Sequence, residues 1–417
     1  MQSIDFSSWI AGWTSLAAVV AFGIFLILNS VRVAKARQSI AKRILVTGSR
    51  GKSGTVRLLH AALSASDIAS YAKITGTEAS ELFVDNTEVE TRRLGPATTC
   101  EMNTALIRAA KQDPQVGIFE CMAVSPKIIK LVTEELVQPE IVIIPTIRLD
   151  HLEEEGLSEL EIAMTVLNAA SAAKIIFTGV SQPEIVEAYR EFAQEHDLDV
   201  RFVASDPSLP EIPGHHPMNV ALSLAVVETM SIGREAAIKA MQQSSLEPNA
   251  RTFERIERAD GSELLLIDIG AANDPESARE AFAHLGLNRG HIAPVIVNRW
   301  ERPLRSLTFI SAAYGRFGTV GVAGTLHTWA NRWVKRENRR LNNHGAHTRF
   351  VKLGFLTARK PEAIWAWTQR FRRLEHRASR SIVLFENIHD RSADRLRKTF
   401  ASTGQVIDQQ ELRVKHG

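Results

Sequence analysis

Short apolar runs alternate with longer amphipathic stretches along most of the chain after residue 40. The runs predict strands, and the stretches between them predict helices, because Val56, Leu59 and Leu63 in the first stretch share one helical face. Strands that alternate with helices form a parallel sheet covered on both sides, so the fold class is α/β. The runs form two groups, RILVTG, VGIFEC, IVIIPTI, KIIFTG and VRFVAS before residue 206, and LLLIDIG, IAPVIVN, GTVGVAG and SIVLFEN after residue 263.

The start of the chain holds an uncharged segment, residues 6–31. It is long enough to cross a bilayer core, for which a helix needs about 20 apolar residues. Trp9 and Trp13 lie where interfacial aromatic residues belong, and several Lys and Arg residues follow at 32–43. A cleaved signal peptide is the alternative, but Asp5 and the lack of a basic residue before the segment disfavour it. The pattern predicts a single-pass anchor in the inner (cytoplasmic) membrane, with the catalytic domains in the cytoplasm.

Composition limits the partners and the compartment. The formal net charge of +3 gives no indication of a nucleic-acid partner. The arginine-rich stretch 332–380 is either a solvated face or a surface that steers a polyanion. The two cysteines, Cys100 and Cys121, are too few for a disulfide framework, and Cys121 follows an apolar run. We therefore expect a reducing compartment and a buried free thiol at Cys121.

The first apolar run opens into the turn GSRGKS, and a helical pattern follows. In such a setting the backbone N–H groups and the helix dipole can hold phosphate oxygens. Lys52 would neutralise the β and γ phosphates, and Ser53 would offer its hydroxyl to Mg²⁺. Val46 stands where the commoner phosphate-loop pattern has its first glycine. The sequence predicts a nucleotide site formed by Gly48, Ser49, Arg50, Gly51, Lys52, Ser53 and Gly54.

Charged side chains follow two later runs. Glu120 closes VGIFE, and Asp150 and His151 come just after IVIIPTI. Because the carboxyl ends of parallel strands meet at one edge of a sheet, these residues are expected near Lys52. Carboxylate oxygens suit Mg²⁺, whereas imidazole is a less usual ligand for it. Taken singly, Glu120 is better interpreted as a salt-bridged acid at a strand end and His151 as a helix cap or surface histidine.

Five segments, in this order, resemble the ligase subunit of poly-γ-glutamate synthase (PgsB/CapB type). That subunit belongs to the Mur ligase superfamily, alongside folylpolyglutamate synthetase. The resemblance is dense over residues 43–156 and thinner beyond, where ENIHD at 386–390 is a weaker match. The uncharged segment directly before the turn also matches. The segments are GSRGKS, KITGTEAS (73–80), ECMAVSP (120–126), RLDHLEEEG (148–156) and IGAANDPES (269–277).

The resemblance implies an ATP- and Mg²⁺-dependent, ADP-forming ligase that phosphorylates a γ-carboxylate and joins glutamate into poly-γ-glutamate. By family position, Lys52, Glu120 and His151 would be catalytic, and Ser53 would join Glu120 and His151 as a metal ligand. Three further residues are implied in nucleotide binding and five in substrate binding. They are Asn219 at the adenine, Arg251 in the interdomain linker and Asp268 on the ribose, and Thr75, Gly76, Thr77, Asn273 and His389 at the substrate.

The resemblance also implies partners, and it leaves gaps. A small multi-spanning membrane subunit is expected, and a homo-oligomer is possible. Many superfamily members carry a carbamylated lysine after the Asp-His pair, but residues 152–173 hold no lysine, so the second metal site is not fully assigned. Glu101 receives no role. Two other functions stay open, a related ligase with another amino-acid acceptor and a P-loop ATPase subunit whose ATP turnover is independent of glutamate.

These patterns predict three parts. At 417 residues the chain exceeds the usual limit of one hydrophobic core. The turn-rich stretch DPSLPEIPGHHP and the Pro248 region separate the two groups of apolar runs. We expect an anchor with its basic juxtamembrane segment over residues 1–37, a P-loop ATP-binding Mur-ligase-type central domain over 38–250, and a smaller Rossmann-like C-terminal ligase domain over 251–417.

Overall fold

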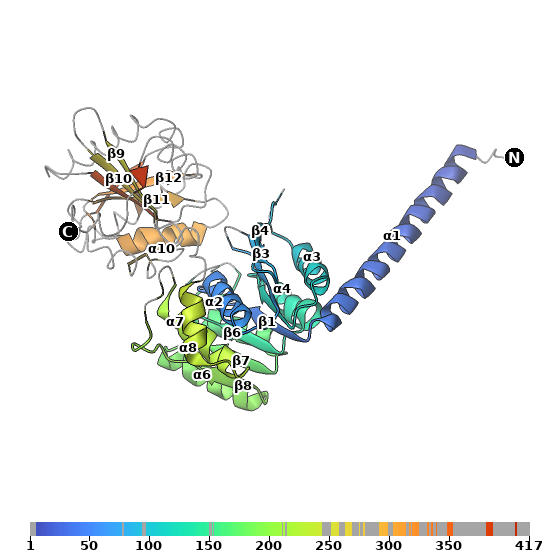
Figure 1. Cartoon of the computed structure of the whole chain (residues 1–417). Helices are drawn as coiled ribbons and strands as arrows, with labels where there is room; N and C mark the ends of the chain where they lie inside the picture. The colour runs from blue at the N-terminus through green and yellow to red at the C-terminus, as the bar shows by residue number, and fades with distance from the viewer. Residues whose placement is uncertain are drawn as a thin grey trace. The chain divides into compact units, whose positions relative to one another are not determined.

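The computed structural model divides into two compact units (Figure 1). One holds Met1–Arg148 with Glu154–Glu247, and the other holds Leu149–Glu153 with Pro248–Gly417. The three-part division drawn from the sequence stays a prediction. The residues that the structure describes are 6–76, 79–93, 97–149, 152, 154–210, 212, 215–243, 252–257, 263–268, 275, 278–279, 292–298, 303–313, 317, 319–324, 332, 335–336, 339, 348–352, 381–386 and 405–406.

The first unit is built on an eight-stranded sheet in the order β4-β3-β2-β5-β1-β6-β7-β8. The strands from β2 to β8 in this order are parallel, whereas β3 and β4 add an antiparallel edge. The five apolar runs predicted β1, β5, β6, β7 and β8 but neither β2 nor the antiparallel edge. The bounds are β1 Lys42–Val46, β2 Ser70–Ile74, β3 Ser80–Leu82, β4 Glu88–Glu90, β5 Val116–Glu120, β6 Ile141–Ile144, β7 Ile175–Thr178 and β8 Asp199–Phe202.

The connections reverse direction around β1. From β1 the chain crosses to β2 on one side, and after β5 it crosses to β6 on the other side. In open α/β sheets ligands bind at such a reversal point, beyond the carboxyl end of the strand, which here is β1. The segment that follows Val46 lies at this point.

Two sets of helices cover this sheet. One set consists of α2, α7 and α8, which pack against one another; in the other, α3 packs on η1, α4 on η1 and α5, and α5 on α6. Ile44 and Val46 of β1 join the apolar cluster beneath α2, α7 and α8, while Leu45, also fully buried, points to the opposite face because side chains alternate along a strand. The bounds are α2 Lys52–Ser64, α3 Thr99–Ala110, α4 Pro126–Leu131, η1 Val132–Val137, α5 Glu159–Ala170, α6 Pro183–Glu195, α7 Pro217–Glu228 and α8 Arg234–Gln242.

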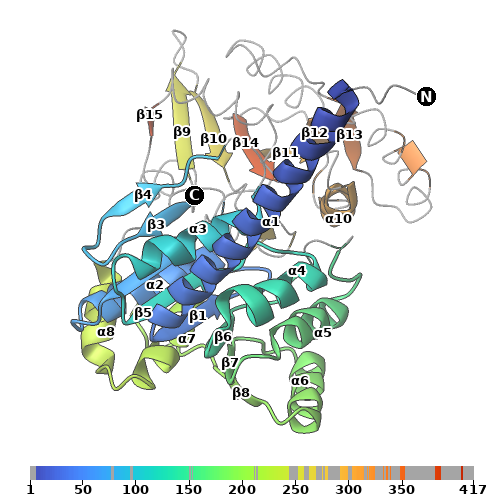
Figure 2. The same ribbon diagram turned by 90° about the vertical axis from the view of Figure 1, so that its right-hand side faces the viewer.

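Helix α1 spans Phe6–Ser39. Its part from Trp13 to Ser39 has a mean hydropathy of 2.2 in its most apolar window and is only 6% buried there, so by length and composition it could cross a membrane. Its last turns pack on the first unit, against α3 and η1, where Val33 and Ala36 are buried. Its amino-terminal part extends away from that unit (Figure 1 and Figure 2). The predicted apolar helix is thus present.

The second unit holds a seven-stranded sheet in the order β13-β12-β11-β14-β10-β9-β15. The first five are parallel, and β9 and β15 are antiparallel to their neighbours. The four apolar runs after residue 263 became β10, β14, β11 and β12, so the prediction of a second α/β sheet is confirmed. The bounds are β9 Thr252–Glu257, β10 Glu263–Asp268, β11 Ile292–Asn298, α10 Pro303–Ala313, β12 Thr319–Gly324, β13 Arg349–Lys352, β14 Ser381–Glu386 and β15 Gln405–Val406.

Candidate active site

The predicted phosphate loop turns sharply between β1 and α2. Gly48 and Gly51 have φ angles of 111° and 82°, a region that favours glycine. Gly51 has a second constraint, because a Cβ there would lie 2.3 Å from Oδ1 of Asn219. Helix α2 begins at Lys52 without a side-chain cap. The glycines therefore allow a tight turn that leaves the first N–H groups of α2 for a ligand.

Hydrogen bonds hold this loop against the segment after β6. The Ser49 N–H donates to the Thr146 carbonyl at 3.0 Å, and the Ser49 hydroxyl donates to the Arg148 carbonyl at 3.2 Å. The Lys52 ammonium donates to the Gly48 carbonyl at 2.5 Å, so this cation lies over the loop. The loop is thus held in a defined conformation, with the Lys52 ammonium against its own backbone.

Ser53 and Glu120 form the centre of the site. Glu120 ends β5 directly beside Val46, and its side chain is buried at 2% exposure. The Ser53 hydroxyl donates to Oε2 of Glu120 at 3.0 Å, and the Thr75 N–H donates to the same oxygen at 2.8 Å. A hydroxyl and a carboxylate side by side supply the hard oxygen ligands that Mg²⁺ prefers, so these residues fit the predicted metal.

The turn after β2 meets the loop at this centre. A Cβ on Gly76 would lie 2.9 Å from the Ser53 hydroxyl oxygen, so Gly76 allows close approach of the two segments. Arg93 donates to the carbonyl of Thr75 at 3.1 Å, and both oxygens of Glu101 accept from Arg93 at 2.8 and 2.9 Å. No pattern in the sequence singled out Arg93 or indicated a role for Glu101. No local pattern links the two, because their contact forms only when α3 packs near the turn.

Asn219 reaches the phosphate loop from α7. It is the third residue of that helix, is 4% exposed, and lies against Gly51. The helix is capped by His216, whose Nδ1 accepts from the Met218 N–H at 3.2 Å. The predicted adenine residue therefore lies beside the loop, while its contact with a base stays a prediction.

Burial shifts the pKa of two other ionisable groups near the site. Burial raises the pKa of the Cys121 thiol to about 11, so the thiolate that would react or bind a metal is disfavoured. Its prediction as a buried free thiol is confirmed. Burial also lowers the pKa of Lys73 on β2, and the nearby Glu81 carboxylate opposes that shift. The Lys73 ammonium donates to the Thr91 hydroxyl at 2.6 Å, which links β2 to the end of β4.

Several predicted residues cannot be compared with the structure. His151, Arg251, Thr77, Asn273 and His389, together with Asp150, lie outside the described residues. Asp268 is the last residue of β10, where its backbone pairs with Thr252 and Phe385. Within the described part of the chain, no group of three or more His, Cys, Asp or Glu side chains gathers as a metal site. Of the three predicted metal ligands, the structure describes Ser53 and Glu120 but not His151.

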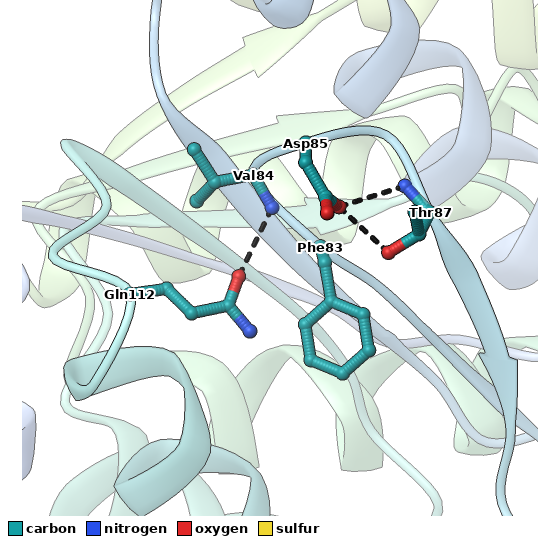
Figure 3. A pocket seen from close by; sticks show the side chains of 5 residues that line it. All are labelled: Phe83, Val84, Asp85, Thr87 and Gln112. Carbon is teal, nitrogen blue, oxygen red and sulfur yellow. Dashed lines mark hydrogen bonds between the residues drawn. The ribbon is translucent and has the colours of Figure 1, made fainter.

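An open hollow lies at the opposite edge of the same sheet (Figure 3). Its lining comes from the turn between β3 and β4 and from Gln112, whose Oε1 accepts from the Val84 N–H at 3.0 Å. Leu82, at the end of β3, pairs with Ala72 toward the amino end of β2, which places the hollow away from the phosphate loop. It carries no basic residue and is not an extension of the nucleotide site. Its lining residues are Phe83, Val84, Asp85, Thr87 and Gln112.

Comparisons with known proteins agree with both halves of this fold. The Mur ligase middle domain model matches residues 46–191, and the poly-gamma-glutamate synthase CapB C-terminal domain model matches residues 253–403. The "Capsule biosynthesis protein CapB" of Bacillus anthracis is 27% identical over 291 residues, which cover 66% of this chain and 61% of that protein. These matches support a CapB-type member of the Mur ligase superfamily. The resemblance stated from the sequence is confirmed.

Other relatives define how far the similarity extends. The "PGA synthase CapB" of Bacillus subtilis (strain 168) is 26% identical over 249 residues, or 57% of this chain and 62% of that protein. The match thus spans about three-fifths of each of these two curated relatives. Folylpolyglutamate synthase of Mycobacterium tuberculosis, solved with ADP and AMPPCP, has a TM-score of 0.56 at 14% identity and covers 94% of this chain and 100% of its own. MurF of Acinetobacter baumannii has a TM-score of 0.57 at 16% identity, covering 90% and 80%. These two structures share the fold.

Proposed function

We propose that this CapB-type chain is an ATP-dependent amide ligase that extends or starts poly-γ-glutamate. The observation that carries the proposal is the convergence of the phosphate loop, the Ser53–Glu120 pair and the Thr75–Gly76 turn at one edge of the first sheet. The name of the Bacillus subtilis relative, PGA synthase, supports the choice of product. The fold shared with a folylpolyglutamate synthase solved with ADP and AMPPCP supports ATP as the nucleotide.

The proposed reaction has two steps. An oxygen of the γ-carboxylate attacks the γ-phosphorus of ATP, and the bond from that phosphorus to the bridging oxygen breaks, which gives an acyl phosphate and ADP. The amine nitrogen of a second glutamate then attacks the acyl carbon. The tetrahedral intermediate loses phosphate and the nitrogen loses a proton, which leaves an amide. Phosphoryl transfer of this kind depends mainly on positioning and charge neutralisation.

The residues at the site fit these demands. Lys52 and the loop N–H groups would hold the transferred phosphoryl group and stabilise its negative charge. Ser53 and Glu120 would hold Mg²⁺, which supplies further charge neutralisation when it is bound. His151 is proposed as a third ligand. The remaining roles are carried by family position alone, Asn219 at the adenine, Arg251 and Asp268 at the nucleotide, and Thr75, Gly76, Thr77, Asn273 and His389 at the substrate.

Helix α1 is proposed as the membrane anchor, with both α/β units in the cytoplasm. Its exposed apolar length from Trp13 onward and the basic residues that follow support this orientation. A small multi-spanning membrane subunit is the proposed partner, and a homo-oligomer is also proposed as possible. Purification in mild detergent should recover such a subunit together with the chain. Recovery of the chain alone would contradict this part of the proposal.

The experiment that tests the function uses membranes that contain the chain, supplied with ATP, Mg²⁺ and labelled glutamate. We expect an amide-linked polymer from the natural chain, no polymer from Lys52→Ala, and polymer from the control Lys42→Ala at the other end of β1. Unchanged polymer from Lys52→Ala would contradict the proposal. ATP turnover independent of glutamate would favour the ATPase subunit, and amide formation with another acceptor would favour the related ligase.

A further inference from the structure

We propose that Arg93 and Glu101 are a positioning pair that orients the Glu120 carboxylate beside Ser53. The pair acts through the backbone of Thr75 and touches neither of the two proposed metal ligands. Its part in catalysis rests on the proposed function, whereas its effect on the metal site can be measured separately.

The guanidinium group of Arg93 bonds both to the Glu101 carboxylate and to the backbone of the turn after β2. Its Nε and one terminal nitrogen donate to the two carboxylate oxygens of Glu101 at 2.8 and 2.9 Å. That terminal nitrogen also donates to the Thr75 carbonyl at 3.1 Å, and the other lies 3.5 Å from the Gly76 carbonyl. Only a planar fork with several N–H groups can make this set, so lysine cannot replace arginine here.

Thr75 connects this fork to the proposed metal ligands. Its carbonyl accepts from Arg93, and its N–H donates to Oε2 of Glu120 at 2.8 Å. The same Glu120 oxygen accepts from the Ser53 hydroxyl at 3.0 Å. Because Thr75 is held on both sides, a shift of its backbone would change the direction of the hydrogen bond that orients the carboxylate. Partners behind metal ligands act in this way in many sites.

The surroundings fix the pair itself. Lys73 donates to the Thr91 hydroxyl, and the Thr91 N–H donates to the Ala79 carbonyl at 2.7 Å, so the chain is held two residues before Arg93. Glu101 lies in the first turn of α3, where the helix dipole favours a carboxylate. The Arg93 and Glu101 side chains are only 22% and 17% exposed, so solvent screens their attraction less than at the surface.

The chain offers a matched control at the other end of β1. Arg43 pairs with Glu140, whose second carboxylate oxygen accepts from the Arg43 N–H at 2.6 Å. This pair is also partly buried and also joins separate elements. None of its hydrogen bonds reaches the phosphate loop or the Thr75–Gly76 turn. A general loss of stability can therefore be separated from a change at the site.

The test measures Mn²⁺ binding to the full-length chain, by electron paramagnetic resonance, with a non-hydrolysable ATP analogue. In Arg93→Lys and Glu101→Gln we expect Mn²⁺ affinity to fall by about 10- to 100-fold, the range typical for partners behind metal ligands. Binding of the analogue without metal should stay within about twofold, since the pair does not touch the phosphate loop. Hydrogen exchange of the peptide holding the Thr75 amide should accelerate. The control Glu140→Gln should change neither measurement.

A charge-swapped double variant, Arg93→Glu with Glu101→Arg, separates the ion pair from its contacts with Thr75. We expect the double variant to have a higher thermal midpoint than either charge reversal alone, because opposite charges again face each other. Its Mn²⁺ affinity should stay low, because residue 93 no longer donates to the Thr75 carbonyl. Full recovery of Mn²⁺ affinity, unchanged affinity in both single variants, or an equal loss in Glu140→Gln would overturn the proposal. A natural chain that binds Mn²⁺ with nucleotide but forms no amide would contradict the proposed function alone.

Discussion

The two ends of strand β1 are built in opposite ways. At the amino end, Arg43 donates to the carbonyl groups of Ile40, Val137 and Gln138 and pairs with Glu140. At the carboxyl end, the chain turns through Gly48 and Gly51, and the first N–H groups of α2 have no side-chain cap. Buried polar groups are normally paired, so the amino end is arranged for stability, while the uncapped carboxyl end fits the ligand site proposed above.

The largest expected effect comes from Lys52→Ala at the carboxyl end. Removal of the ammonium over the loop should lower glutamate-dependent ATP turnover by roughly 10²- to 10³-fold, the cost of losing one donor to developing charge. The thermal midpoint should change little, because Lys52 bonds only to the Gly48 carbonyl among the contacts described. Kinetics and melting curves of this variant, beside Lys42→Ala, test whether the two ends differ as described.

Gly51→Ala should have the next largest effect on ligand binding at the carboxyl end. A Cβ at this position would lie 2.3 Å from Oδ1 of Asn219, and a φ of 82° is strained for alanine by about 1–2 kcal/mol. We expect weaker binding of a fluorescent ATP analogue by about tenfold, the equivalent of about 1.4 kcal/mol. Gly23→Ala is the control, since its Cβ would meet nothing within 4 Å. Equal binding by both variants would mean that the turn tolerates a side chain.

Arg43→Ala should lower the free energy of unfolding by about 2–4 kcal/mol, because it leaves the partly buried Glu140 carboxylate without its cation. Turnover per folded molecule should remain that of the natural chain at a temperature where the variant is folded. Denaturant titration and steady-state kinetics measure the two quantities. A fall in turnover that exceeds the loss of folded protein would show that the amino end also shapes the site.

His60, on α2, should have an effect only through pH. Burial lowers its pKa from 6.5 to about 4, and its Nδ1 bonds to the Ser70 hydroxyl at the start of β2. The folded state therefore disfavours the proton that the unfolded state binds below pH 6.5. Stability should fall by about 2 kcal/mol as the pH drops from about 7.5 to about 5. His60→Gln should weaken this dependence of stability on pH. An unchanged dependence would mean that other groups cause it.

The sequence was sufficient for the parts whose signals are local. The apolar runs that became β1, β5 and β6 predicted the parallel sheet, and the strand order then explains why Glu120 lies beside Ser53. The phosphate loop was recognisable because glycine, lysine and serine follow a strand and precede a helix. Both predictions depend on patterns within about ten residues of one another.

The rest required tertiary structure. The short strands β3 and β4 carry the sequences SEL and EVE, which hold too few apolar residues to mark a strand. They nevertheless bring the chain back so that Arg93 meets Glu101 and the Thr75 carbonyl. Lys73 lies in a buried strand although lysine is rarely buried, because Glu81 and Thr91 are its partners. No spacing in the sequence indicates such contacts.

Transfer of oxygen from substrate to phosphate tests the central claim most directly. If the carboxyl edge of the first sheet activates a γ-carboxylate by phosphorylation, a substrate labelled with ¹⁸O in that γ-carboxylate should transfer one ¹⁸O to each phosphate released. Mass spectrometry of the phosphate measures this transfer. We predict this transfer in the natural chain, in step with amide formation, and its loss in Lys52→Ala. Amide formation with unlabelled phosphate would contradict an acyl phosphate and, with it, the proposed use of this site.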